Sequence, residues 1–400
     1  MIPDNRVLIA GAGPVGLVAA AALARRNVPV TVLEASASLS EESRASTFHP
    51  STLDFLDELG FAGALIAQGL KAPGLQYRSR RDGVLARFDF GLIHDITRHP
   101  YRLQAEQFKL TRIIHAKLSG DPNYQIEFGQ RVCGVMQDPD GVTVQVQSAD
   151  GAVAARRGSW LIGADGARSE VRVALAMEFE GFTWPERFLV VSTPFDFYSV
   201  IPELDPVTYV ADPQQWHFLL QIPGAWRLMF PIAPEVSDAD ALTQAFAQAQ
   251  LATVVPGHSN YEIIHTTLYR VHQRVAKSFR AGRVFLAGDA AHINNPLGGM
   301  GMNGGIHDAL NLVERLARVW HGEAAEPELD RYDLQRRGIT MEYVQTHSIA
   351  NKRNLEAREP AEQDRFRDEM RAITANPGRA HAYLERVSMI ASLKRAAELG

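Results

Sequence analysis

The sequence has very little cysteine, since Cys133 is the only one in 400 residues. A single cysteine excludes an intramolecular disulfide and any metal cluster built on several cysteines, and it fits a protein of the reducing cytoplasm. The sequence also lacks a long basic block, and its 41 lysines and arginines are outnumbered by 46 aspartates and glutamates. This balance argues against a surface for nucleic acid or another polyanion, while it leaves room for a local basic pocket.

One stretch of eighteen residues without charge, Val7 to Ala24, superficially resembles a signal peptide or a membrane span. Three glycines and Pro14 interrupt it at turn positions, and it is not followed by a small-residue cleavage site with a translocated tail. We therefore interpret it as a strand, a turn and a helix, and we expect no membrane span. The remaining composition, 46% hydrophobic and 22% charged, is typical of a globular protein. The length suggests about two to three domains.

The chain is organised around this N-terminal glycine turn. An apolar strand leads into Gly11, Gly13 and Gly16, and an alanine- and leucine-rich helix follows. Gly11 permits the turn, Gly13 lets a pyrophosphate approach bare backbone, and Gly16 lets helix and strand pack closely. The helix start offers free N–H groups and a positive dipole end. A second strand ends at Glu34, 18 residues past Gly16, where a carboxylate can bind ribose hydroxyls. The turn therefore predicts a ligand that carries an ADP moiety.

Two further buried strands end in glycine-rich turns. One leads into Asp165 and Gly166, and the other into Gly288 and Asp289. In an open parallel sheet such turns gather at the carboxyl ends of the strands, where ligands bind. Two carboxylates there suit the hydroxyls of a sugar alcohol. A metal site would need more oxygen or nitrogen donors close by, so we expect no metal.

The pattern changes in the second half of the chain. Residues 178–270 contain aromatic, β-prone runs and few helical stretches, which predicts a second sheet inserted into the nucleotide-binding fold. Earlier in the chain, the β-prone segments at 124–128, 132–137 and 142–147 predict a small set of antiparallel strands. The chain beyond residue 328 is charged and helical in pattern, and it ends in an expected single amphipathic helix over 380–399. Such a tail is typical of a packing element or of the contact in a homodimer.

Three motifs carry a resemblance to a known family: Gly11 to Gly16 with Glu34, Gly163 to Ser169, and Gly288 to Asn303. In this order they resemble the fingerprints of the single-component (group A) FAD-dependent aromatic hydroxylases, which are flavoprotein monooxygenases with the para-hydroxybenzoate hydroxylase fold. The resemblance covers about residues 5–320. It implies an α/β fold with a Rossmann-like FAD-binding domain, an inserted β-sheet substrate domain and a C-terminal helical segment. The expected boundaries are 1–75, 102–177 and 271–328 for the FAD-binding domain, 76–101 and 178–270 for the substrate domain, and 329–400 for the C-terminal helical segment.

The resemblance also implies which residues hold FAD. The first motif and Glu34 would bind the ADP half, while Arg44 and Gln104 would lie against the pyrophosphate and the ribityl chain. Asp289 would bind ribityl hydroxyls, and the turn at Asp165 would serve both FAD and the nicotinamide cofactor. The loop of the third motif would approach the flavin ring. The expected cofactor contacts are Gly11, Gly13, Pro14, Val15, Gly16, Glu34, Ala35, Arg44, Gln104, Asp165, Gly166, Gly288, Asp289, Pro296, Gly299, Met300, Gly301, Met302 and Asn303.

The implied reaction has two halves. NADH or NADPH, as a transient co-substrate, reduces the flavin, and O2 then forms a flavin C4a-hydroperoxide. That species hydroxylates an electron-rich aromatic small molecule, either a phenol or a hydroxylated heteroaromatic. The protein supplies orientation, a dry pocket and proton handling. The sequence contains no second three-glycine turn for the nicotinamide cofactor, which suits a family in which it docks transiently.

Catalytic candidates come from the inserted sheet and from the residues before the third-motif proline. His217 and Tyr209 are candidate bases for the substrate hydroxyl, and Tyr198 and His49 are alternatives, although each of these residue types commonly fills a core. We expect His292, which follows the Gly-Asp turn, to be structural.

Substrate contacts are also expected just before the flavin-facing loop. Asn295, together with Asn294, could hydrogen-bond a polar substrate, and Pro296 would face the ring. Loop amides also commonly bond their own backbone. Arginines at positions 78, 80, 81, 102 and 227 could meet a substrate carboxylate, although arginine on a surface loop is commoner. The sequence leaves the aromatic substrate and the choice between NADH and NADPH open.

Other functions fit parts of the pattern. An FAD-dependent reductase of the same fold would share the FAD motifs, and a non-catalytic FAD- or NAD-binding protein would need only the nucleotide turn. The complete Gly-Asp and Asp-Gly motifs favour an enzyme, because a scaffold need not keep a flavin-ring loop. A flavin halogenase is disfavoured, because the segment Ile222 to Arg227 does not match the Trp-x-Trp-x-Ile-Pro signature of halogenases.

Overall fold

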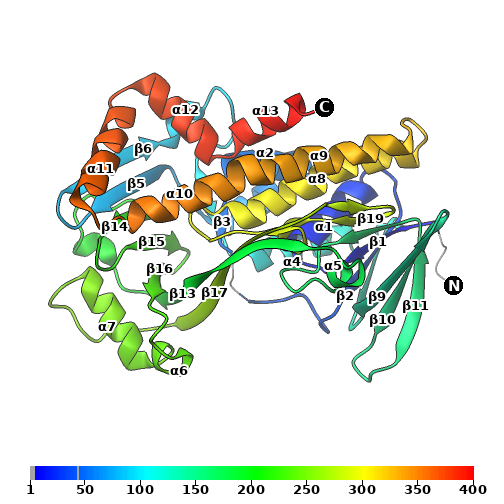
Figure 1. Ribbon diagram of the computed structural model, residues 1–400, viewed down its shortest axis with the longest axis horizontal. Coiled ribbons are helices and arrows are strands. Elements are labelled where there is room, and N and C mark those ends of the chain that lie inside the picture. The colour runs from blue at the N-terminus through cyan, green and yellow to red at the C-terminus, as the bar shows by residue number, and fades with distance from the viewer. Residues whose placement is uncertain (1–4, 43–44) are drawn as a thin grey trace.

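The N-terminal strand β1 (Val7–Ala10) lies inside a six-stranded sheet in the computed structural model, which describes residues 5–42 and 45–400 (Figure 1). The strand order is β18-β19-β12-β1-β2-β8, and all neighbours except β18 and β19 are parallel. The inner strands are buried on both faces, which explains their continuous apolar sequences. The other five strands are β2 (Val30–Glu34), β8 (Tyr124–Phe128), β12 (Trp160–Gly163), β18 (Arg280–Ala281) and β19 (Val284–Leu286).

Helix α1 (Pro14–Ala24) is buried from Gly16 to its end, because its alanines and leucines are apolar all round. It packs against α4 (Gln107–Leu118) and α8 (Met300–Trp320). Helix α8 begins at Met300, inside the third glycine-rich motif, and ends at Trp320.

The prediction for residues 124–128 is wrong in its pairing. This segment is β8, which pairs in parallel with β2 in the six-stranded sheet. The antiparallel set consists instead of β9 (Arg131–Asp138), β10 (Gly141–Gln147) and β11 (Val153–Gly158). The physical reason is the helix α4 that precedes β8, because a helical crossover brings the next strand back parallel to its neighbour.

A second sheet has eight strands in the order β20-β17-β13-β16-β15-β14-β5-β6. In Figure 1, β13 and β17 are long strands that run from this sheet toward the first. Residues 178–270 contribute strands to this second sheet, as predicted, and the runs 187–193, 216–222 and 226–232 fall largely within them. The strands are β5 (Gly74–Ser79), β6 (Gly83–Asp89), β13 (Phe179–Thr193), β14 (Val207–Ala211), β15 (His217–Ile222), β16 (Ala225–Ile232), β17 (His265–Ala276) and β20 (His292–Ile293).

The two faces of this sheet belong to different hydrophobic clusters. One face, which we call the inner face, carries Tyr77, Tyr209 and Met229 and packs with Leu297 and the C-terminal helices. The outer face carries Leu228 and Phe230 and is covered by α7 (Gln244–Val254) and the short α6 (Asp238–Ala241). The inner face therefore turns toward the loop that precedes α8.

A small sheet, β3-β7-β4, lies beside these two layers. Its strands are β3 (Thr47–Phe48), β4 (Leu70–Ala72) and β7 (Arg102–Gln104). Helices α2 (Pro50–Glu58) and α3 (Ala62–Ile66) connect β3 to β4, and α5 (Glu170–Ala174) follows β12.

The predicted single helix over 380–399 is wrong, because it consists of two helices. Met389 has a φ of 63° and separates α12 from α13, and the preceding Ser388 is buried, with its carbonyl accepting from the Ser51 hydroxyl at 2.7 Å. Neither glycine nor proline marks this bend in the sequence. The C-terminal elements are α9 (Asp330–Ile339), a π-helical turn (Thr340–Gln345), α10 (Thr346–Leu355), α11 (Pro360–Thr374), α12 (Pro377–Val387) and α13 (Ile390–Glu398).

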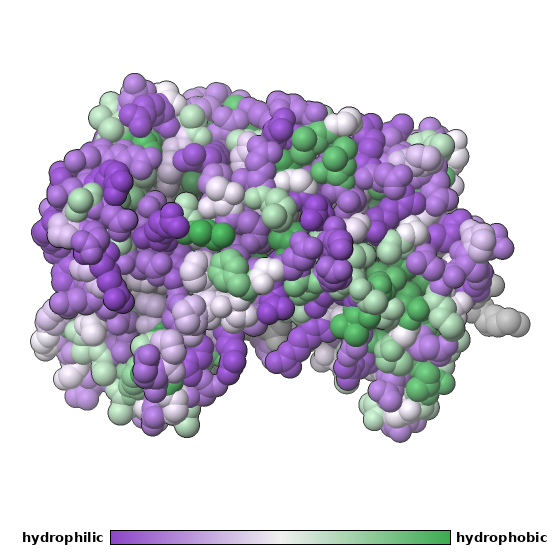
Figure 2. All heavy atoms as spheres, viewed as in Figure 1, coloured by the Kyte–Doolittle hydropathy of each residue, from purple (hydrophilic) through white to green (hydrophobic). Residues whose placement is uncertain are grey.

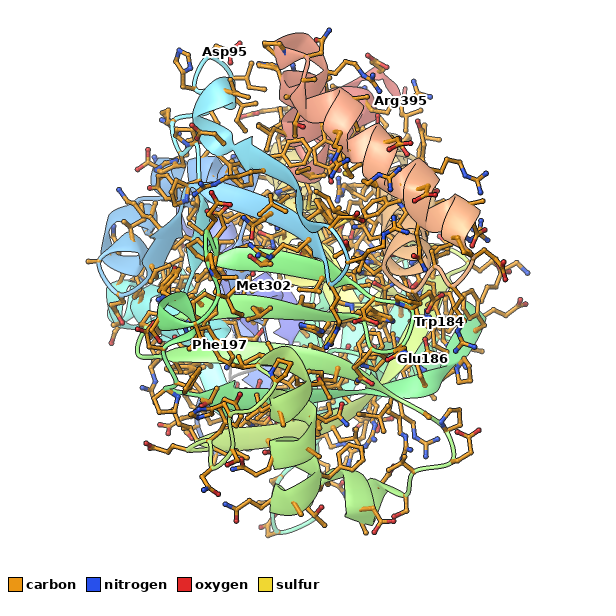
Figure 3. All side chains as sticks on the ribbon, turned by 90° about the vertical axis from the view of Figure 1, so that its left-hand side faces the viewer. Asp95, Trp184, Glu186, Phe197, Met302 and Arg395 are labelled. Atoms are coloured by element: carbon orange, nitrogen blue, oxygen red, sulfur yellow. The ribbon has the colours of Figure 1, made fainter. Side chains whose placement is uncertain are left out.

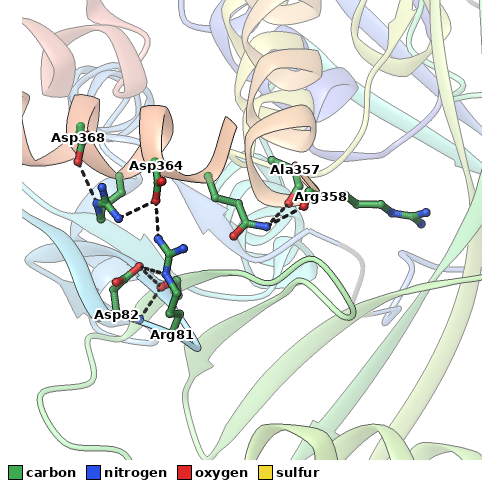
Figure 4. Close-up of polar contacts among 9 residues, drawn as sticks. Arg81, Asp82, Ala357, Arg358, Asp364 and Asp368 are labelled. Atoms are coloured by element: carbon green, nitrogen blue, oxygen red, sulfur yellow. Dashed lines mark hydrogen bonds and ion pairs between the residues drawn. The ribbon is translucent and has the colours of Figure 1, made fainter. Parts of the chain in front are cut away.

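Ion pairs fasten these helices to the second sheet. Arg81, in the turn between β5 and β6, binds Asp364 of α11 at 2.7 Å (Figure 4). Trp184 and Glu186 belong to the part of β13 where its pairing with β17 is interrupted, and Figure 3 labels both on the same side of the molecule. Lys352 of α10 pairs with Glu186 and lies 4.2 Å from the centre of the Trp184 ring. The C-terminal helices thus cover part of the inner face.

Hydrophilic residues cover most of the face of the molecule shown in Figure 2. The large exposed side chains Met136 and Val153 belong to the three-stranded sheet. Within residues 5–42 and 45–400, no helix is both long and apolar enough to cross a membrane.

Candidate active site

The first glycine turn leaves an open surface at the start of α1. A Cβ at Gly11, whose φ is 98°, would lie 2.5 Å from the carbonyl oxygen of Ala164, and one at Gly16 would lie 2.0 Å from that of Gly11. At Gly13 a Cβ would meet no described atom within 4 Å apart from its chain neighbours. Gly13 is the N-cap of α1, and no side chain caps this helix. Its first N–H groups therefore face a surface on which a pyrophosphate can lie.

Glu34 is fixed at the end of β2 beside this turn. One carboxylate oxygen accepts the Ala12 N–H at 2.7 Å, and the other accepts the Ser36 N–H at 2.9 Å. With Gly13 and Pro14, Glu34 lines a small cleft, and the neighbouring Ala35 is exposed. The geometry suits a carboxylate that accepts from ribose hydroxyls at the mouth of the nucleotide turn.

The three predicted turns meet at one edge of the sheet, as the parallel register requires. Ala10 pairs with Gly163, which pairs with Leu286. Val15 of α1 packs into the third turn, where its Cγ2 would lie 2.8 Å from a Cβ at Gly288. The predicted gathering of the turns is confirmed, and it places all three glycine motifs around one site.

The two acids of these turns have different surroundings. Asp165 accepts from the Ser169 hydroxyl at 2.6 Å and from the Val171 N–H at 3.1 Å, and burial raises the pKa of its carboxyl. Asp289 is exposed, although Gly288 and Ala290 beside it are buried. Asp165 therefore stabilises the turn to which it belongs, and a Cβ at the neighbouring Gly166 would meet no described atom within 4 Å. Asp289 lies at the surface of the site. Arg44 lies outside the described residues.

A fully buried ion cluster holds the third turn in place. Asp308 of α8 accepts from His292 at 2.7 Å, from Arg336 of α9 at 2.7 Å and from the Gly288 N–H at 3.1 Å. Burial alone would raise the pKa of Asp308, but the neighbouring His292 and Arg336 hold it at about 2. The expected structural role of His292 agrees with these contacts. The cluster links the turn at Asp289 to two helices.

The glycine-rich loop before α8 is organised by Asn303. Its amide donates to the carbonyl oxygens of Thr47 at 2.8 Å and Gly299 at 2.7 Å, and its side-chain oxygen accepts the His49 N–H at 3.0 Å. The N-cap Gly299 has a φ of 70°, and no side chain caps α8. The positive end of α8 therefore points into this loop.

Gln104 lies next to the same loop. Its side-chain oxygen accepts from the Thr47 hydroxyl at 2.8 Å. Its Nε2 is buried and has no hydrogen-bond partner among the described residues. A buried amide donor without a partner costs about 1–3 kcal/mol unless a ligand accepts from it. An acceptor on a ligand between β7 and the loop would satisfy this donor.

His49 also binds the loop. Its Nε2 lies 2.9 Å from the Gly298 carbonyl and 3.2 Å from that of Gly299, so this nitrogen carries the hydrogen. Burial, together with the nearby Arg102, holds the pKa of His49 well below its usual range. The imidazole is therefore neutral, and its buried Nδ1 has no partner in the described part of the chain.

The residues before Pro296 form an amide network with the π-helical turn. Asn295 donates to the carbonyl of Ser348 at 2.9 Å and accepts the Leu297 N–H at 3.1 Å. Gln273 of β17 accepts the Asn295 N–H at 3.2 Å and donates to Gln345 at 2.5 Å and to Ser348 at 2.9 Å. Asn295 is fully buried in this network, so its amide is committed to holding the loop.

The other predicted loop residues contact neighbouring parts of the protein, by a hydrogen bond at Asn294 and by packing at Met300. Asn294 donates to the carbonyl of Asn295 at 2.6 Å. Met300 is buried with Val344 and Met389. Met302 is half-buried at the start of α8, where Figure 3 shows it behind the strands of the second sheet. A Cβ at Gly301 would lie 3.5 Å from the side-chain oxygen of Asn294.

The structure separates the predicted bases. Tyr209 pairs with Phe218 and His217 with Val210, so His217 and Tyr209 point to opposite faces of the sheet. The Tyr209 hydroxyl accepts the Gly298 N–H at 3.2 Å, at the loop.

His217 packs instead on Phe230 of the outer face, and burial lowers its pKa to about 4. Tyr198 is 42% exposed and packs on Trp226, also of the outer cluster. Tyr209 and His49 reach the loop, whereas His217 and Tyr198 do not.

The candidate arginines fall into two groups, three that are partly exposed and two that are buried. Arg80 and Arg81 are half-exposed and pair with Asp212 and Asp82 at the rim of the second sheet. Arg78 is also partly exposed, and it donates to the carbonyl of Pro202 at 3.0 Å. Arg102 and Arg227 are buried, with exposed fractions of 2% and 6%. Arg227 lies on the inner face and donates to the Ser46 hydroxyl at 3.2 Å.

Several organising residues were not predicted from the sequence. These are Gln273, Asp308, Arg336 and Gln345. A possible signal was the pair His307-Asp308 on the apolar stripe of a helix, since buried polar residues need partners. The described residues contain no group of three or more His, Cys, Asp or Glu side chains that could hold a metal ion.

Known proteins resemble this chain along nearly its whole length. Residues 4–347 match the FAD binding domain family. The chain is 34% identical over 379 residues to para-nitrophenol 4-monooxygenase from a Pseudomonas species, covering 94% of this chain and 92% of the relative. It is 34% identical over 368 residues to 6-hydroxy-3-succinoylpyridine 3-monooxygenase from Pseudomonas putida, covering 90% and 92%. The crystal structure of p-nitrophenol 4-monooxygenase from Pseudomonas putida superposes with a TM-score of 0.90 at 31% identity, covering 96% of this chain and 98% of that one.

Proposed function

The chain belongs to the FAD-dependent aromatic hydroxylases, and from that premise we propose that it hydroxylates a small phenol held between the loop before α8 and the inner face of the second sheet. The enzyme is a monooxygenase that uses NAD(P)H and O2 with FAD as cofactor. When bound, FAD supplies the redox chemistry, taking electrons from NAD(P)H and activating O2 for the transfer of one oxygen atom to the ring.

The residues present fit FAD. Gly13 and the uncapped start of α1 offer an open surface for an anion, and Glu34 beside this turn would accept from the hydroxyls of an adenosine ribose. The unpartnered Nε2 of Gln104 and the exposed carboxylate of Asp289 would bind further along the cofactor. The uncapped start of α8 would place backbone N–H groups and a positive dipole end against negative charge on the reduced ring.

The loop before α8 would form the meeting point of cofactor and substrate. Asn303 and the amide network of Asn295 fix its backbone from both sides. Pro296 would lie nearest the reacting ring carbon, and Tyr209 would hold the substrate through its ring and hydroxyl. We assign Asn295 a positioning role, because both ends of its amide are bonded within the protein.

The inner face and the relatives support this substrate class. This face presents half-buried apolar side chains, Phe218, Leu220 and Tyr269, next to the loop. Such a surface suits a flat ring. The two curated relatives are named for a nitrophenol and a hydroxypyridine, each an aromatic ring with a hydroxyl group. The apolar inner face closing on the glycine loop is the observation that carries the proposal.

The experiment is a substrate panel on the purified, FAD-loaded enzyme. NADH or NADPH oxidation is followed with 4-nitrophenol, with hydroxypyridines and with benzene derivatives that lack a hydroxyl group. We expect phenols to stimulate oxidation and to yield a hydroxylated product by mass spectrometry, while the derivatives without a hydroxyl group do not. Stimulation without an oxygenated product would favour a reductase, and a colourless protein that takes up no FAD would reject the assignment.

We also propose that the enzyme works in the cytoplasm. It needs NAD(P)H, and Cys133 is a free, exposed thiol that suits a reducing compartment.

A further inference from the structure

Arg102 is a buried cation with no acidic partner in the described part of the chain. It lies on β7, is 2% exposed, and makes no ion pair with any acidic side chain in the described part of the chain. Its Nε has no hydrogen-bond partner among those residues, and its Nη2 is 3.4 Å from the carbonyl of Val387. Its guanidinium carbon lies 5.6 Å from the centre of the Phe90 ring. Burying an uncompensated charge is costly, so a residue kept in this state calls for an anionic partner.

Three ionisable side chains of the described residues face Arg102, and all three are neutral. They come from three elements: His49 before α2, Tyr77 on β5 and Tyr383 on α12. Burial raises the pKa of Tyr77 well above its usual range and raises that of Tyr383, while burial lowers the pKa of His49. The Tyr383 hydroxyl donates to that of Tyr77 at 2.9 Å. None of these side chains can neutralise the guanidinium at physiological pH.

Further charged or ionisable groups lie around these three. Tyr209 stacks on Tyr77 with ring centres 5.4 Å apart. Arg386 lies 5.5 Å from the Tyr383 ring, and the neutral His307 faces His49. None of these side chains adds a negative charge near Arg102, so the surroundings of its guanidinium favour an anionic ligand.

This cluster adjoins the proposed active site. Arg102 and Gln104 are two residues apart on one strand, so their side chains leave the same face of the small sheet. Gln104 carries the orphaned donor beside the glycine loop, and His49 and Tyr209 bind the backbone of Gly298 in that loop. The cation and the loop therefore border one region, with tyrosine rings along it.

We propose that Arg102 binds the ionised ring hydroxyl of the aromatic substrate and favours its phenolate form. This inference rests on the proposed function and adds the residue that selects an anionic ring. The aromatic neighbours favour a flat oxyanion over a phosphate or a free carboxylate ion. An ionised hydroxyl makes the ring more nucleophilic, so the same contact that binds the substrate prepares it for oxygen transfer.

The test uses 4-nitrophenol as the probe, because its phenolate is yellow. The probe is titrated with pH in the presence of excess FAD-loaded enzyme, and difference spectra are recorded against the enzyme alone. A cation within hydrogen-bond range lowers the pKa of an acid by about 1–3 units, so the bound probe should ionise at a pH lower by about that amount than the free probe. Ionisation at the pH of the free probe, or above it, overturns the inference.

Variants assign the shift to Arg102. Arg102→Met should abolish the downward shift and weaken phenolate binding at least about tenfold, a loss of about 1.4 kcal/mol. Arg102→Lys should keep part of both. Arg98→Met is the matched control, because Arg98 precedes β7 but is 57% exposed, and it should behave as wild type. An equal shift in Arg102→Met overturns the inference.

The outcomes separate this inference from the function beneath it. If Arg102→Met does not retain FAD, the wild-type titration and the Arg102→Lys variant still test the inference. A lysine variant that lowers the pKa of the bound probe as much as the wild type does contradicts a site specific for the guanidinium. An enzyme that binds FAD but no phenol contradicts both proposals. Binding of the probe without a shifted titration contradicts the role of Arg102 alone.

Discussion

Replacing Gly13 with alanine separates cofactor binding from folding. Gly13 has a φ of −70° and ψ of 178°, which alanine adopts without strain, and the added methyl group would meet no described atom within 4 Å. The substitution therefore leaves the apoprotein unstrained. It places the methyl group on the surface where the pyrophosphate of FAD would lie.

The magnitudes follow from this geometry. A Gly→Ala change at a compatible position stabilises a protein by about 0.4–1 kcal/mol through the unfolded state. For a chain of this length that raises the melting temperature by only about 1 °C. Losing one charge-assisted hydrogen bond to the cofactor costs about 1.5–3 kcal/mol, which weakens FAD binding by about ten- to a hundredfold.

Gly16→Ala is the structural comparison. Its Cβ would lie 2.0 Å from the Gly11 carbonyl oxygen, so helix and strand must separate. We expect the apoprotein to lose about 1–3 kcal/mol or more of stability. Melting curves of the apoproteins and fluorescence titrations with FAD measure both effects. If Gly13→Ala bound FAD with wild-type affinity, the proposed pyrophosphate site at the start of α1 would be refuted. If the Gly13→Ala apoprotein were destabilised, the inference that the space beside Gly13 is open would be refuted.

Three further predictions concern the supporting residues. Asp308→Asn leaves Arg336 buried without a counter-ion and should lower the free energy of unfolding by about 3–5 kcal/mol in denaturant titrations. In the wild type, His292 and Arg336 overcome the effect of burial and hold the pKa of Asp308 at about 2. The contribution of Asp308 to the free energy of unfolding is therefore complete above about pH 4 and is lost as the pH falls through 2. A loss of this contribution near neutral pH would contradict the assignment. Gln273→Leu breaks the amide network and should lower the hydroxylated product formed per NAD(P)H severalfold while FAD stays bound; unchanged coupling would show that the loop needs no such support. His217→Phe should keep wild-type turnover, because His217 lies on the outer face. A loss of turnover with intact folding would show that His217 contributes to catalysis.

Local motifs made the three glycine turns and their gathering predictable. Each glycine turn follows an apolar strand directly, so strand, turn and helix could be predicted within a few residues. The parallel register that joins Ala10, Gly163 and Leu286 then follows from the alternation of strands and helices. The same logic, applied to the helix before Tyr124, would have placed β8 correctly.

The substrate side depends on contacts between distant segments. The faces on which Tyr209 and His217 lie are set by strand register, and a shift of one residue would exchange them. The partners of Asn295 lie on β17 and beyond the π-helical turn, 22 and 53 residues away. Arg102 could be named among the candidate arginines, but the lack of an acidic partner among the residues that the structure describes becomes visible only in the folded chain.

The most direct test of the central claim is a turnover of 4-nitrophenol by the FAD-loaded enzyme under oxygen-18 gas. The account predicts that the aromatic stimulates NAD(P)H oxidation and that the product carries one labelled oxygen atom from O2. A product without the label, or NAD(P)H oxidation that the phenol does not stimulate, would contradict it.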